Sequence, residues 1–591
     1  MASVLPPLFL MKKIAVLAAF LSCFGSLKTS AQAPAARPAP LPATVIIPAS
    51  DFIQEIPKGN IIADAGNLKA PWIFNNTALV LKSKTNLMTR VLVPEAGRYT
   101  LFVRSQGEKS TSFKVAINDQ VTAENFGHGP LSWQAGGTFE LPAGRTYVKL
   151  TRIEMGAAVD VLVLSKNAGL KAEDIRPYQL AEEVQLLKQY TIPPSNAVKF
   201  GDVDGDGKTD FMVLEPDFSA HVFDNAGKEL WAYQAPAEYV KERSEFEAPG
   251  VLWDFNHDGR AEVVHWRFID GQEWLVVAEG RTGKILRKTA WPTQPLPHVY
   301  NNFRLAIAHL HAGPANDLVA YTDMGGTENV TAYSADLKQL WQHTEHRKKD
   351  NLGHYIYPVD FNGDGLDEVL VGSLLLDTNG KEIWNRFDLL PDNHDHADSY
   401  KFIDLNGDGR LDIATANSET GVFVYEAMTG NIIWQNTAEH CQQLAVGNFL
   451  KNVPAPQVVV GGRTYGSRAA DEPGLSSQLY WFDNAGNLVK KWPGNPINGN
   501  PDFVRGNWRG DGSTTLFWHK FRLNDAGTGE LYFPDMVFHM FDFTGQGAEE
   551  VITLSQGRLS VFGSRRAAHS GRDLKKDAEY LRNSVVNHTH Y

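Results

Sequence analysis

The sequence predicts an all-β protein, an eight-bladed β-propeller preceded by a small β-sandwich of the jelly-roll type. Three observations support this fold class. An Asp- and Gly-rich loop recurs from residue 198 onward, short apolar strands flank the intact copies, and a Trp-containing phrase follows several of them. Repeats of this length, each built from four short strands, are typical of propeller blades. Seven blades is the alternative to eight.

The N-terminal segment, residues 1–33, has the pattern of a secretory signal. Lys12 and Lys13 precede an apolar run that ends near Leu27, and small residues follow at 30–33. A run of this length is too short to span a bilayer comfortably. We place the start of the signal at Met11 and regard residues 1–10 as an upstream extension. The prediction is export to the periplasm or the exterior, with no transmembrane segment in the mature chain.

The composition of the chain limits the kinds of molecule that it could bind and the way in which it is stabilised. The net charge of the 591 residues is -12 and no basic tract is present, which argues against nucleic acid. A chain of this length exceeds one hydrophobic core, so two or more domains are expected. Beyond the signal, Cys441 is the only cysteine, so no internal disulfide can form. Burial or bound ions must therefore hold the exported protein together, and we expect a monomer.

A Pro/Ala linker at 34–44 leads into residues 45–168, which alternate apolar strands with Gly and Pro turns. This pattern is typical of a β-sandwich. The phrases at 96–104 and 141–150 resemble carbohydrate-binding modules, in which Trp72 and Trp133 would be the stacking platforms. A packing domain without a ligand is the alternative. Ile175, Leu180, Val184 and Leu187 then follow a helical period, so 169–197 is predicted to be a helical linker to the propeller at 198–591.

Four loops of one form carry oxygen ligands at positions 1, 3, 5 and 9, with glycine between them. Such a loop can wrap a hard cation, and each is predicted to hold a structural Ca²⁺. The ligands are Asp202, Asp204, Asp206, Asp210; Asp254, Asn256, Asp258, Glu262; Asp360, Asn362, Asp364, Glu368; and Asp404, Asn406, Asp408, Asp412. Within each blade the loop is expected to join the first and second strands, so that all of them lie on one face of the disc.

Degenerate copies of the loop complete the set of eight. His309 and His311, with Asp317, occupy positions 1, 3 and 9 of one copy, and the others begin at Asn448, Asn507 and Asp542. We interpret the histidines as part of a structural loop. The Trp phrase, which contains Trp231, Trp384 and Trp434 in three blades, is predicted to form the hairpin between the two outer strands, with Trp between blades.

The functional site is expected on the face opposite the calcium loops, where segments before each first strand and after each second strand converge. Polar and aromatic residues are frequent in these segments. They include His265, Trp266, Arg267, His354, Tyr355, His396, Glu419, His440, Arg463, Tyr465, Lys520 and Arg522. In β-propellers the functional site commonly lies in a central pocket, and we expect such side chains to line it here.

Several motifs resemble family 11 polysaccharide lyases, the rhamnogalacturonan lyases. His396-Ala397-Asp398 is similar to the family's His-Gly-Asp segment, Glu419 falls in its His-Glu-Glu cluster, and residues 428–434 and 579–591 match two further segments. Asn417-Ser418 departs from the second cluster, and residues 507–511 only partly match a Trp-Trp-Asp-Gly-Asp phrase. The resemblance covers about 198–591. It implies a calcium-dependent, eight-bladed lyase that cleaves a polysaccharide of rhamnose and uronic acid.

Cleavage beside a uronic acid requires a cation on its carboxylate, a base for the C5 proton and an acid for the leaving oxygen. His396 and Glu419 are the predicted ligands of an active-site divalent ion, either Ca²⁺ or the softer Mn²⁺ or Zn²⁺. Lys520 and Tyr465 are predicted as base and acid. Arg463 or Arg267 would clamp the carboxylate, and His440 belongs to the catalytic group or to the metal. His265, Trp266, His354, Tyr355 and Arg522 complete the predicted substrate contacts.

Three alternatives stay open. A hydrolase or lyase acting on a related polymer is the nearest, and a glycan-binding propeller without catalysis is the second. The third is a cell-surface adhesion module of the integrin-like repeat type.

Overall fold

The computed structural model divides into Met1–Pro42 and Ala43–Tyr591, and all residues that it describes lie in the second unit. These are residues 43–49, 52–54, 62–64, 77–171, 181–193, 195, 197–237, 249–292, 303–323, 327–346, 353–390, 395–418, 420–437, 441–454, 456–462, 478–491, 503–518, 523–525, 531–533, 537–555 and 557–587.

Two antiparallel sheets form the part of the chain before residue 170. The six strands of one sheet are β3 (Ile62–Asp64), β4 (Thr77–Val80), β11 (Ala158–Ser165), β6 (Gly97–Gly107) and β9 (Gly129–Leu141), with β1 (Thr44–Pro48) paired to β11. The five strands of the other are β2 (Ile53–Gln54), β5 (Leu87–Val93), β10 (Gly144–Glu154), β7 (Ser112–Ile117) and β8 (Gln120–Val121). Alternate residues of β6 and β10, such as Leu101 and Leu150, are buried in one core shared by both sheets.

The described residues that follow form eight antiparallel sheets of four strands, which we call sheets one to eight. Sheets one to three are β13 (Ala197–Gly201), β14 (Asp210–Leu214), β15 (Ala220–Phe223), β16 (Glu229–Tyr233); β17 (Gly250–Trp253), β18 (Glu262–Ile269), β19 (Gln272–Ala278), β20 (Ile285–Ala290); and β21 (Phe303–Ala308), β22 (Asp317–Asp323), β23 (Thr327–Tyr333), β24 (Gln339–His346). Sheets four and five are β25 (Ile356–Val359), β26 (Glu368–Val371), β27 (Leu374–Leu376), β28 (Glu382–Asn385); and β29 (Ala397–Ile403), β30 (Asp412–Asn417), β31 (Gly421–Glu426), β32 (Ile432–Asn436). Sheets six and seven are β33 (Cys441–Gly447), β34 (Gln457–Gly462), β35 (Gln478–Phe482), β36 (Leu488–Lys491); and β37 (Phe503–Gly506), β38 (Thr515–Trp518), β39 (Leu523–Asp525), β40 (Leu531–Phe533). In sheet eight the strand order is β12 (Val184–Thr191), β43 (Arg558–Ser564), β42 (Glu550–Ser555) and β41 (Val537–Phe541). Here β41 is counted as the first strand and β12 as the fourth.

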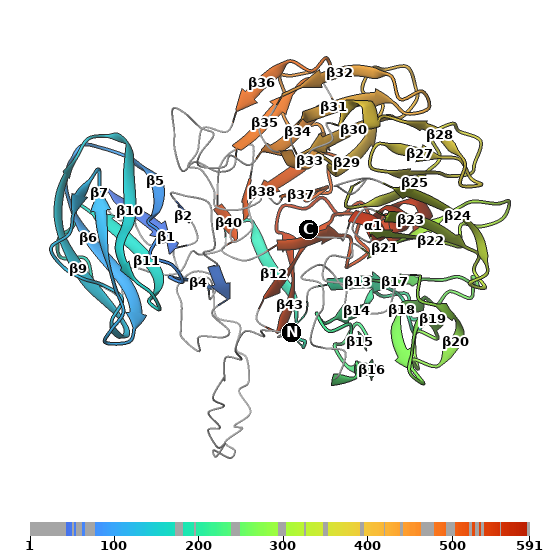
Figure 1. Cartoon of the computed structure of the whole chain (residues 1–591), viewed down its shortest axis with the longest axis horizontal. Helices are drawn as coiled ribbons and strands as arrows, with labels where there is room; N and C mark the ends of the chain where they lie inside the picture. Colours follow the sequence, from blue (N-terminus) through green and yellow to red (C-terminus); the bar gives the residue numbers. More distant parts are fainter. Residues whose placement is uncertain are drawn as a thin grey trace, which may run out of the picture. The chain divides into compact units, whose positions relative to one another are not determined.

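The first strands of sheets one to seven face the middle of a ring, and the fourth strands of sheets one to six lie at its rim (Figure 1). First strands such as β17 and β21 are buried along their length, whereas the outer strands β20 and β24 alternate between exposed and half-buried residues. Neighbouring first strands contact one another, and the ring of Phe200 in β13 stacks on Phe541 in β41 at 5.0 Å. Sheets one and eight are therefore neighbours as well.

The Asp-rich loops and their degenerate copies each join the first and second strands of one sheet, as predicted. The Trp phrases form the hairpins between third and fourth strands, also as predicted. Trp231, Trp384 and Trp434 each donate their indole N–H to a carbonyl of the corresponding turn in the next sheet, at 2.7, 2.8 and 3.1 Å. These repeated bonds hold neighbouring sheets in register.

The segment predicted to be a helical linker at 169–197 contains a strand instead. β12 pairs along its length with β43, and so an N-terminal strand completes a sheet whose other strands come from the C-terminal part of the chain. Glu183, which precedes β12, is buried and accepts two hydrogen bonds from Arg509, at 2.9 and 3.0 Å. The apolar spacing fits a helix equally well, but the unpaired edge of β43 favours a strand. Residues 172–180 lie outside the described part.

The described helical segments are short. The 3-10 turns η5 (Phe387–Leu389) and η6 (Leu574–Lys576) and the helix α1 (Ala578–Asn587) are those that the structure describes. The hydroxyl of Tyr580 in α1 donates to Glu549 at 3.2 Å, and Arg582 pairs with the buried Asp367. α1 thus ties the ends of several sheets together.

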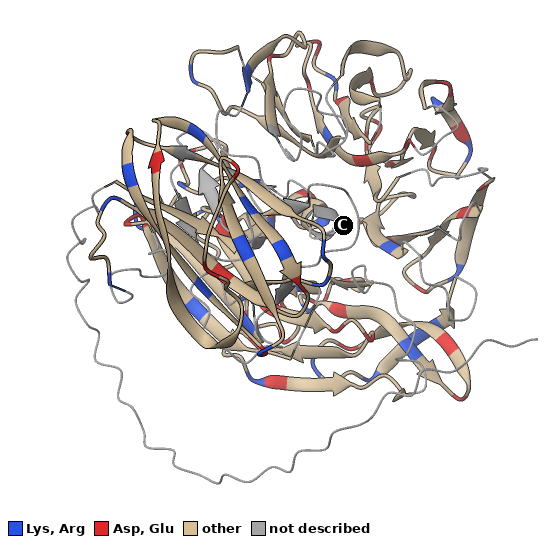
Figure 2. Cartoon of the chain, turned by 60° about the vertical axis from the view of Figure 1, so that its left-hand side comes forward, with Lys and Arg blue, Asp and Glu red and all other residues tan. Residues whose placement is uncertain are grey.

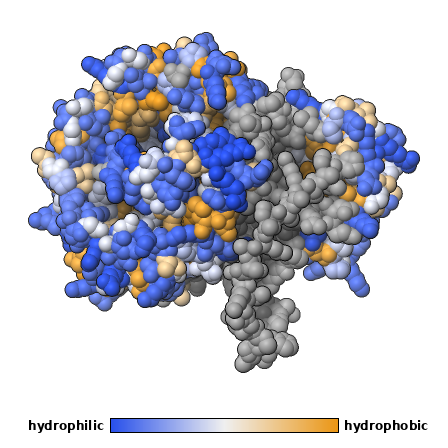
Figure 3. Space-filling model, turned by 180° about the vertical axis from the view of Figure 1, so that it is seen from behind, coloured by the Kyte–Doolittle hydropathy of each residue, from blue (hydrophilic) through white to orange (hydrophobic). Residues whose placement is uncertain are grey.

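Charged residues of both signs are interspersed over the described sheets (Figure 2). The face seen in Figure 3 is mostly hydrophilic, and apolar residues appear there as separate patches. In the described part of the chain no helix is long and apolar enough to cross a membrane.

Candidate functional site

Two histidines and one aspartate meet where the first strands of sheets four and five begin. His354 precedes β25, His396 precedes β29, and Asp398 lies in β29. The Asp-rich loops follow the opposite ends of these strands, so the three residues lie on the predicted functional face.

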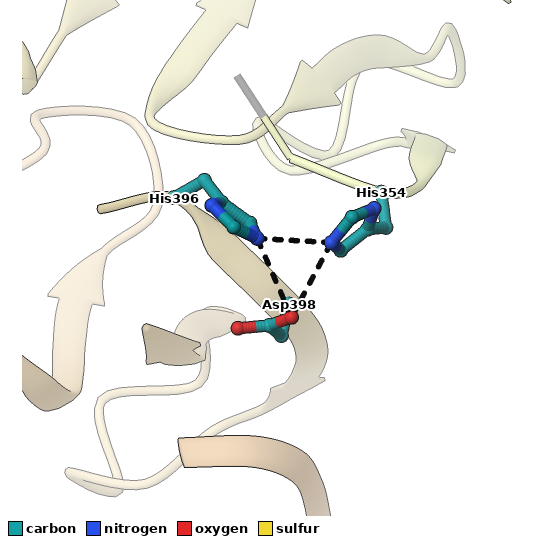
Figure 4. Close-up of side chains that lie close together, drawn as sticks. All are labelled: His354, His396 and Asp398. Carbon is teal, nitrogen blue, oxygen red and sulfur yellow. Dashed lines mark hydrogen bonds and ion pairs between the residues drawn. The ribbon is translucent and has the colours of Figure 1, made fainter. Parts of the chain in front are cut away.

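The polar atoms of this cluster are close together (Figure 4). The Nε2 atoms of His354 and His396 are 2.9 Å apart, and they lie 3.3 and 3.5 Å from Oδ1 of Asp398. The side chains of His354 and Asp398 are 4% and 2% exposed, and that of His396 is 14% exposed. We call these three residues the His-His-Asp cluster.

Local backbone irregularity turns Asp398 toward the histidines. The pairing of β29 with β30 shifts register between Ala397 and Ser399, which leaves Asp398 as the extra residue of a β-bulge. The amide of Ser418 donates to the carbonyl of His396 at 3.1 Å, and its hydroxyl donates to Oδ2 of Asp398. The amide of His354 donates to the carbonyl of Ala397 at 3.3 Å. These bonds fix both histidines and the carboxylate in place.

Electrostatics favour a neutral His354 beside an ionised Asp398. Burial lowers the pKa of His354 below its usual range, and the proximity of His396 and Arg304 lowers it further. Burial alone would raise the pKa of Asp398, but the facing His396 and His354 hold it well below its ordinary value. Metal ligands need these same protonation states. Nitrogen, nitrogen and oxygen donors within 4.8 Å of one another form a set that could hold a metal ion.

The sequence placed only part of this cluster. His396 was predicted as a metal ligand, but His354 was assigned to substrate, and Asp398 was noted only within a motif. The signal for Asp398 was the His-x-Asp spacing at the start of a first strand. The remaining predicted residues on this face, Glu419, His440, Arg463, Tyr465, Lys520 and Arg522, lie outside the described residues.

The structure buries His265 and Trp266 of sheet two, which were predicted as substrate contacts, and leaves Arg267 half-buried. His265 is fully buried, and its Nε2 is 2.9 Å from Nε of Arg267. Trp266 is 1% exposed and donates to Glu273 at 3.1 Å. The guanidinium of Arg267 lies over the rings of Trp231 and Tyr233, at 5.4 and 5.2 Å. Its role as the carboxylate clamp stays a prediction.

Tyr355 is 4% exposed, and its ring lies 6.2 Å from Tyr357 in the core around β25. Its ring is therefore part of this core, and its predicted contact with substrate stays a prediction. The guanidinium of Arg304 in β21 lies 5.6 Å from the centre of the Tyr355 ring. Arg304 is buried, and Lys401 in β29 is half-buried; burial and the nearby Arg505 lower the pKa of Lys401 to about 7. The sequence did not single out these inner-strand cations.

The Asp-rich loops are organised by their own backbone amides. In the first loop, Asp202 accepts N–H bonds from Gly205 and Gly207, both at 2.7 Å, and Asp210 accepts from Val203 at 2.9 Å. Oxygens of Asp202, Asp204 and Asp210 lie within 4.8 Å of one another. Burial raises the pKa of Asp210 to about 7. Burial disfavours the ionised form of this carboxyl group, and a cation bound beside it would stabilise that form.

Comparison with known proteins points to one group of enzymes. No family model matches the chain. Rhamnogalacturonan endolyase YesW of Bacillus subtilis (strain 168) is 23% identical over 307 residues, which covers 41% of this chain and 47% of the relative. The chain thus matches about half the length of this curated relative.

Two solved structures share the fold over most of their length. The exotype rhamnogalacturonan lyase YesX has a TM-score of 0.52 at 16% identity, covering 87% of this chain and 93% of that one. The Bacillus licheniformis rhamnogalacturonan lyase PL11 has a TM-score of 0.52 at 15% identity, covering 92% and 96%. The chain therefore has a fold like that of family 11 polysaccharide lyases.

Proposed function

We propose that this chain, with its fold like that of family 11 polysaccharide lyases, is an exported lyase that cleaves a polysaccharide of rhamnose and uronic acid. The observation that carries the proposal is the His-His-Asp cluster. It places three donor atoms within 4.8 Å on the face opposite the Asp-rich loops. A metal site of this kind can support several reactions. Because the solved structures that share the fold are rhamnogalacturonan lyases, we favour polysaccharide cleavage by a lyase.

The proposal extends to the architecture. The ring of eight four-stranded sheets is then an eight-bladed propeller closed by β12, and the two sheets before residue 170 are an accessory carbohydrate-binding module. Trp133 in β9 is half-buried against Phe102 and Val163, so it offers at most one edge or face to a sugar. Trp72, the other predicted platform, lies outside the described residues. The signal at 1–33 supports export.

The cluster fits a divalent ion. Two imidazoles whose Nε2 atoms are 2.9 Å apart have at most one proton to share between them, and Asp398 adds a negative charge. Two nitrogens and one oxygen suit Mn²⁺ or Zn²⁺ better than Ca²⁺, which prefers oxygen ligands alone. Glu419 follows Ser418 directly, and Ser418 contacts Asp398, so the predicted ligand Glu419 would add a second carboxylate.

When bound, the ion would neutralise the uronate carboxylate and thereby acidify the adjacent C5 proton. His354, His396 and Asp398 would orient the substrate through that ion, and Ser418 and the β-bulge keep Asp398 in position. Tyr465 and Arg463 come shortly after β34, and Lys520 comes shortly after β38, at the strand ends that face the same side. We retain Lys520 as base, Tyr465 as acid and Arg463 as carboxylate clamp. His440 precedes β33 and Arg522 follows Lys520, so both fit beside this group.

We also propose structural Ca²⁺ in the four intact loops. Their carboxylate and amide oxygens are hard ligands, and backbone amides already orient the first carboxylate of each loop. The bonds from Gly363 and Gly365 to Asp360, at 2.7 and 2.9 Å, repeat those made to Asp202. The same geometry in separate loops favours one shared role.

The deciding experiment is incubation with rhamnogalacturonan and other uronic-acid polymers, with and without chelator. A lyase produces an unsaturated uronate, which raises the ultraviolet absorbance. New reducing ends without that rise would indicate a hydrolase, and binding without either would indicate a glycan-binding protein. Both of these results contradict the proposal.

A further inference from the structure

The loop of sheet three, residues 309–317, has the frame of a calcium loop but different donors. The amide of Leu310 donates to Oδ2 of Asp317 at 3.0 Å, as Val203 donates to Asp210 at 2.9 Å in sheet one. Asp317 therefore occupies position 9 in the same way. Positions 1 and 3, which are Asp or Asn in the intact loops, are His309 and His311, and position 5 is a glycine.

Two of these three donors are in contact. Nδ1 of His311 lies 2.8 Å from Oδ2 of Asp317, a carboxylate whose side chain is 1% exposed. Among the described residues, Oδ1 of Asp317 and Nε2 of His309 are buried without a hydrogen-bond partner. Buried polar atoms without a hydrogen-bond partner destabilise the folded state. In sheet one, residues at the same three positions bring their oxygens within 4.8 Å.

The frame of the loop is held from both neighbouring sheets. Trp253 of sheet two donates to the carbonyl of Ala315 at 3.0 Å. The amide of His309 donates to Asp367 of sheet four at 2.7 Å, and the amide of Asp367 donates back to the carbonyl of His309 at 2.8 Å. Asp367 also pairs with Arg582 of α1. His311 is 55% exposed, which leaves a route for an ion.

We propose that His309, His311 and Asp317 bind Zn²⁺ or a similar borderline ion in place of Ca²⁺. Two imidazole nitrogens and one carboxylate are a common ligand set for Zn²⁺ and a poor one for Ca²⁺. The ion would draw Nε2 of His309 onto the existing His311–Asp317 pair and satisfy both unpaired atoms. Because the loop is bonded through Asp367 to Arg582, the ion would also strengthen the attachment of the C-terminal helix. This inference is independent of the proposed lyase activity.

The test measures zinc bound per chain after incubation with Zn²⁺ and gel filtration. The His-His-Asp cluster can also bind zinc, so the measurement uses the full chain carrying His396→Ala, with and without His311→Ala. Because His311 is exposed, its replacement should not unfold the sheet. Loss of a supporting group near a metal costs about 10–100-fold in affinity, so loss of a direct ligand should cost at least about 100-fold. His257→Asn is the matched control. His257 lies at a non-ligand position of the intact loop of sheet two, with a φ of 59° that Asn tolerates.

The expected result is one zinc fewer in the chain with His311→Ala, and no change with His257→Asn. In addition, His309→Asp combined with His311→Asp should restore the oxygen donors. It should shift the ion-dependent rise in Tm from Zn²⁺ to Ca²⁺. Equal zinc content with and without His311→Ala would overturn the proposal.

Discussion

At the scale of single residues, the His-His-Asp cluster gives the sharpest test of function. Its members come from two sheets, and each contributes one donor atom to the same small volume. Removing one imidazole takes away side-chain contacts within the cluster but leaves the backbone hydrogen bonds of His354 and His396 in place. Loss of function without loss of fold is therefore the expected outcome.

We predict that His354→Ala and His396→Ala each remove most lyase turnover and weaken metal binding at the site, with little change in Tm. Asp364→Ala is the comparison, because Asp364 lies in an exposed loop on the opposite face and should affect stability more than rate. Steady-state rates by ultraviolet absorbance and melting curves distinguish the two effects. Normal turnover by His354→Ala would remove it from the site.

Proton transfer gives a second prediction at this scale. Tyr465→Phe keeps the ring and removes the hydroxyl, so the rate should fall by about 10²–10⁴-fold if Tyr465 is the general acid. KM should change little, since the ring contacts remain. Turnover equal to that of the unaltered protein would show that another group protonates the leaving oxygen.

At the scale of elements, the Asp-rich loops act as small units that tie first strands to second strands. Each loop buries the carboxyl group at position 9 against its own backbone. Burial raises the pKa of Asp210 and of Glu550, at the same position in sheet eight, to about 7. Without a cation these groups oppose folding once they are ionised.

The third prediction concerns chelation and pH. In EDTA the folded chain holds protons on Asp210 and Glu550 up to about pH 7, whereas the unfolded chain releases them near pH 4. Stability without metal should therefore fall as the pH rises from about 4 to 7. Bound Ca²⁺ stabilises the ionised form by mass action. The drop in Tm caused by EDTA should be larger at about pH 8 than at about pH 5, and identical curves with and without EDTA at both values would contradict bound calcium.

At the scale of the whole molecule, closure of the ring depends on β12. This strand pairs with β43, and Glu183 beside it pairs with Arg509 of sheet seven. Opening sheet eight would expose the edge of β43 and leave a buried carboxylate, or its arginine partner, without a counter-ion. An unpaired edge of this kind favours aggregation.

Two truncated chains test closure. A chain beginning at Ala181 keeps β12 and should stay folded and monomeric, with activity on soluble oligosaccharide and weaker retention on polymer. A chain beginning at Ala197 lacks β12 and should melt at a lower temperature and aggregate. Gel filtration and melting curves compare the two. Equal stability would show that β12 is dispensable, and loss of activity in the longer, folded chain would place part of the site in the first two sheets.

The sequence by itself determined the features that repeat locally. An Asp-x-Asp loop between two apolar strands specifies its own turn through contacts within nine residues, and Trp231 and its counterparts mark the outer hairpins. The regular spacing of these loops and phrases predicted eight units and placed each loop between a first and a second strand. It also predicted the side on which His396 lies.

Tertiary structure alone decided which side chains meet. His354 and Asp398 are far apart in the chain, and a bulge in β29 turns Asp398 toward both histidines. Arg267 lies within β18, where the rings of Trp231 and Tyr233 hold it between sheets. Val184–Thr191 carries a pattern that fits helix or strand, and the open edge of β43 selects the strand. In each case the deciding contact joins residues distant in sequence, so a local pattern carries no information about it.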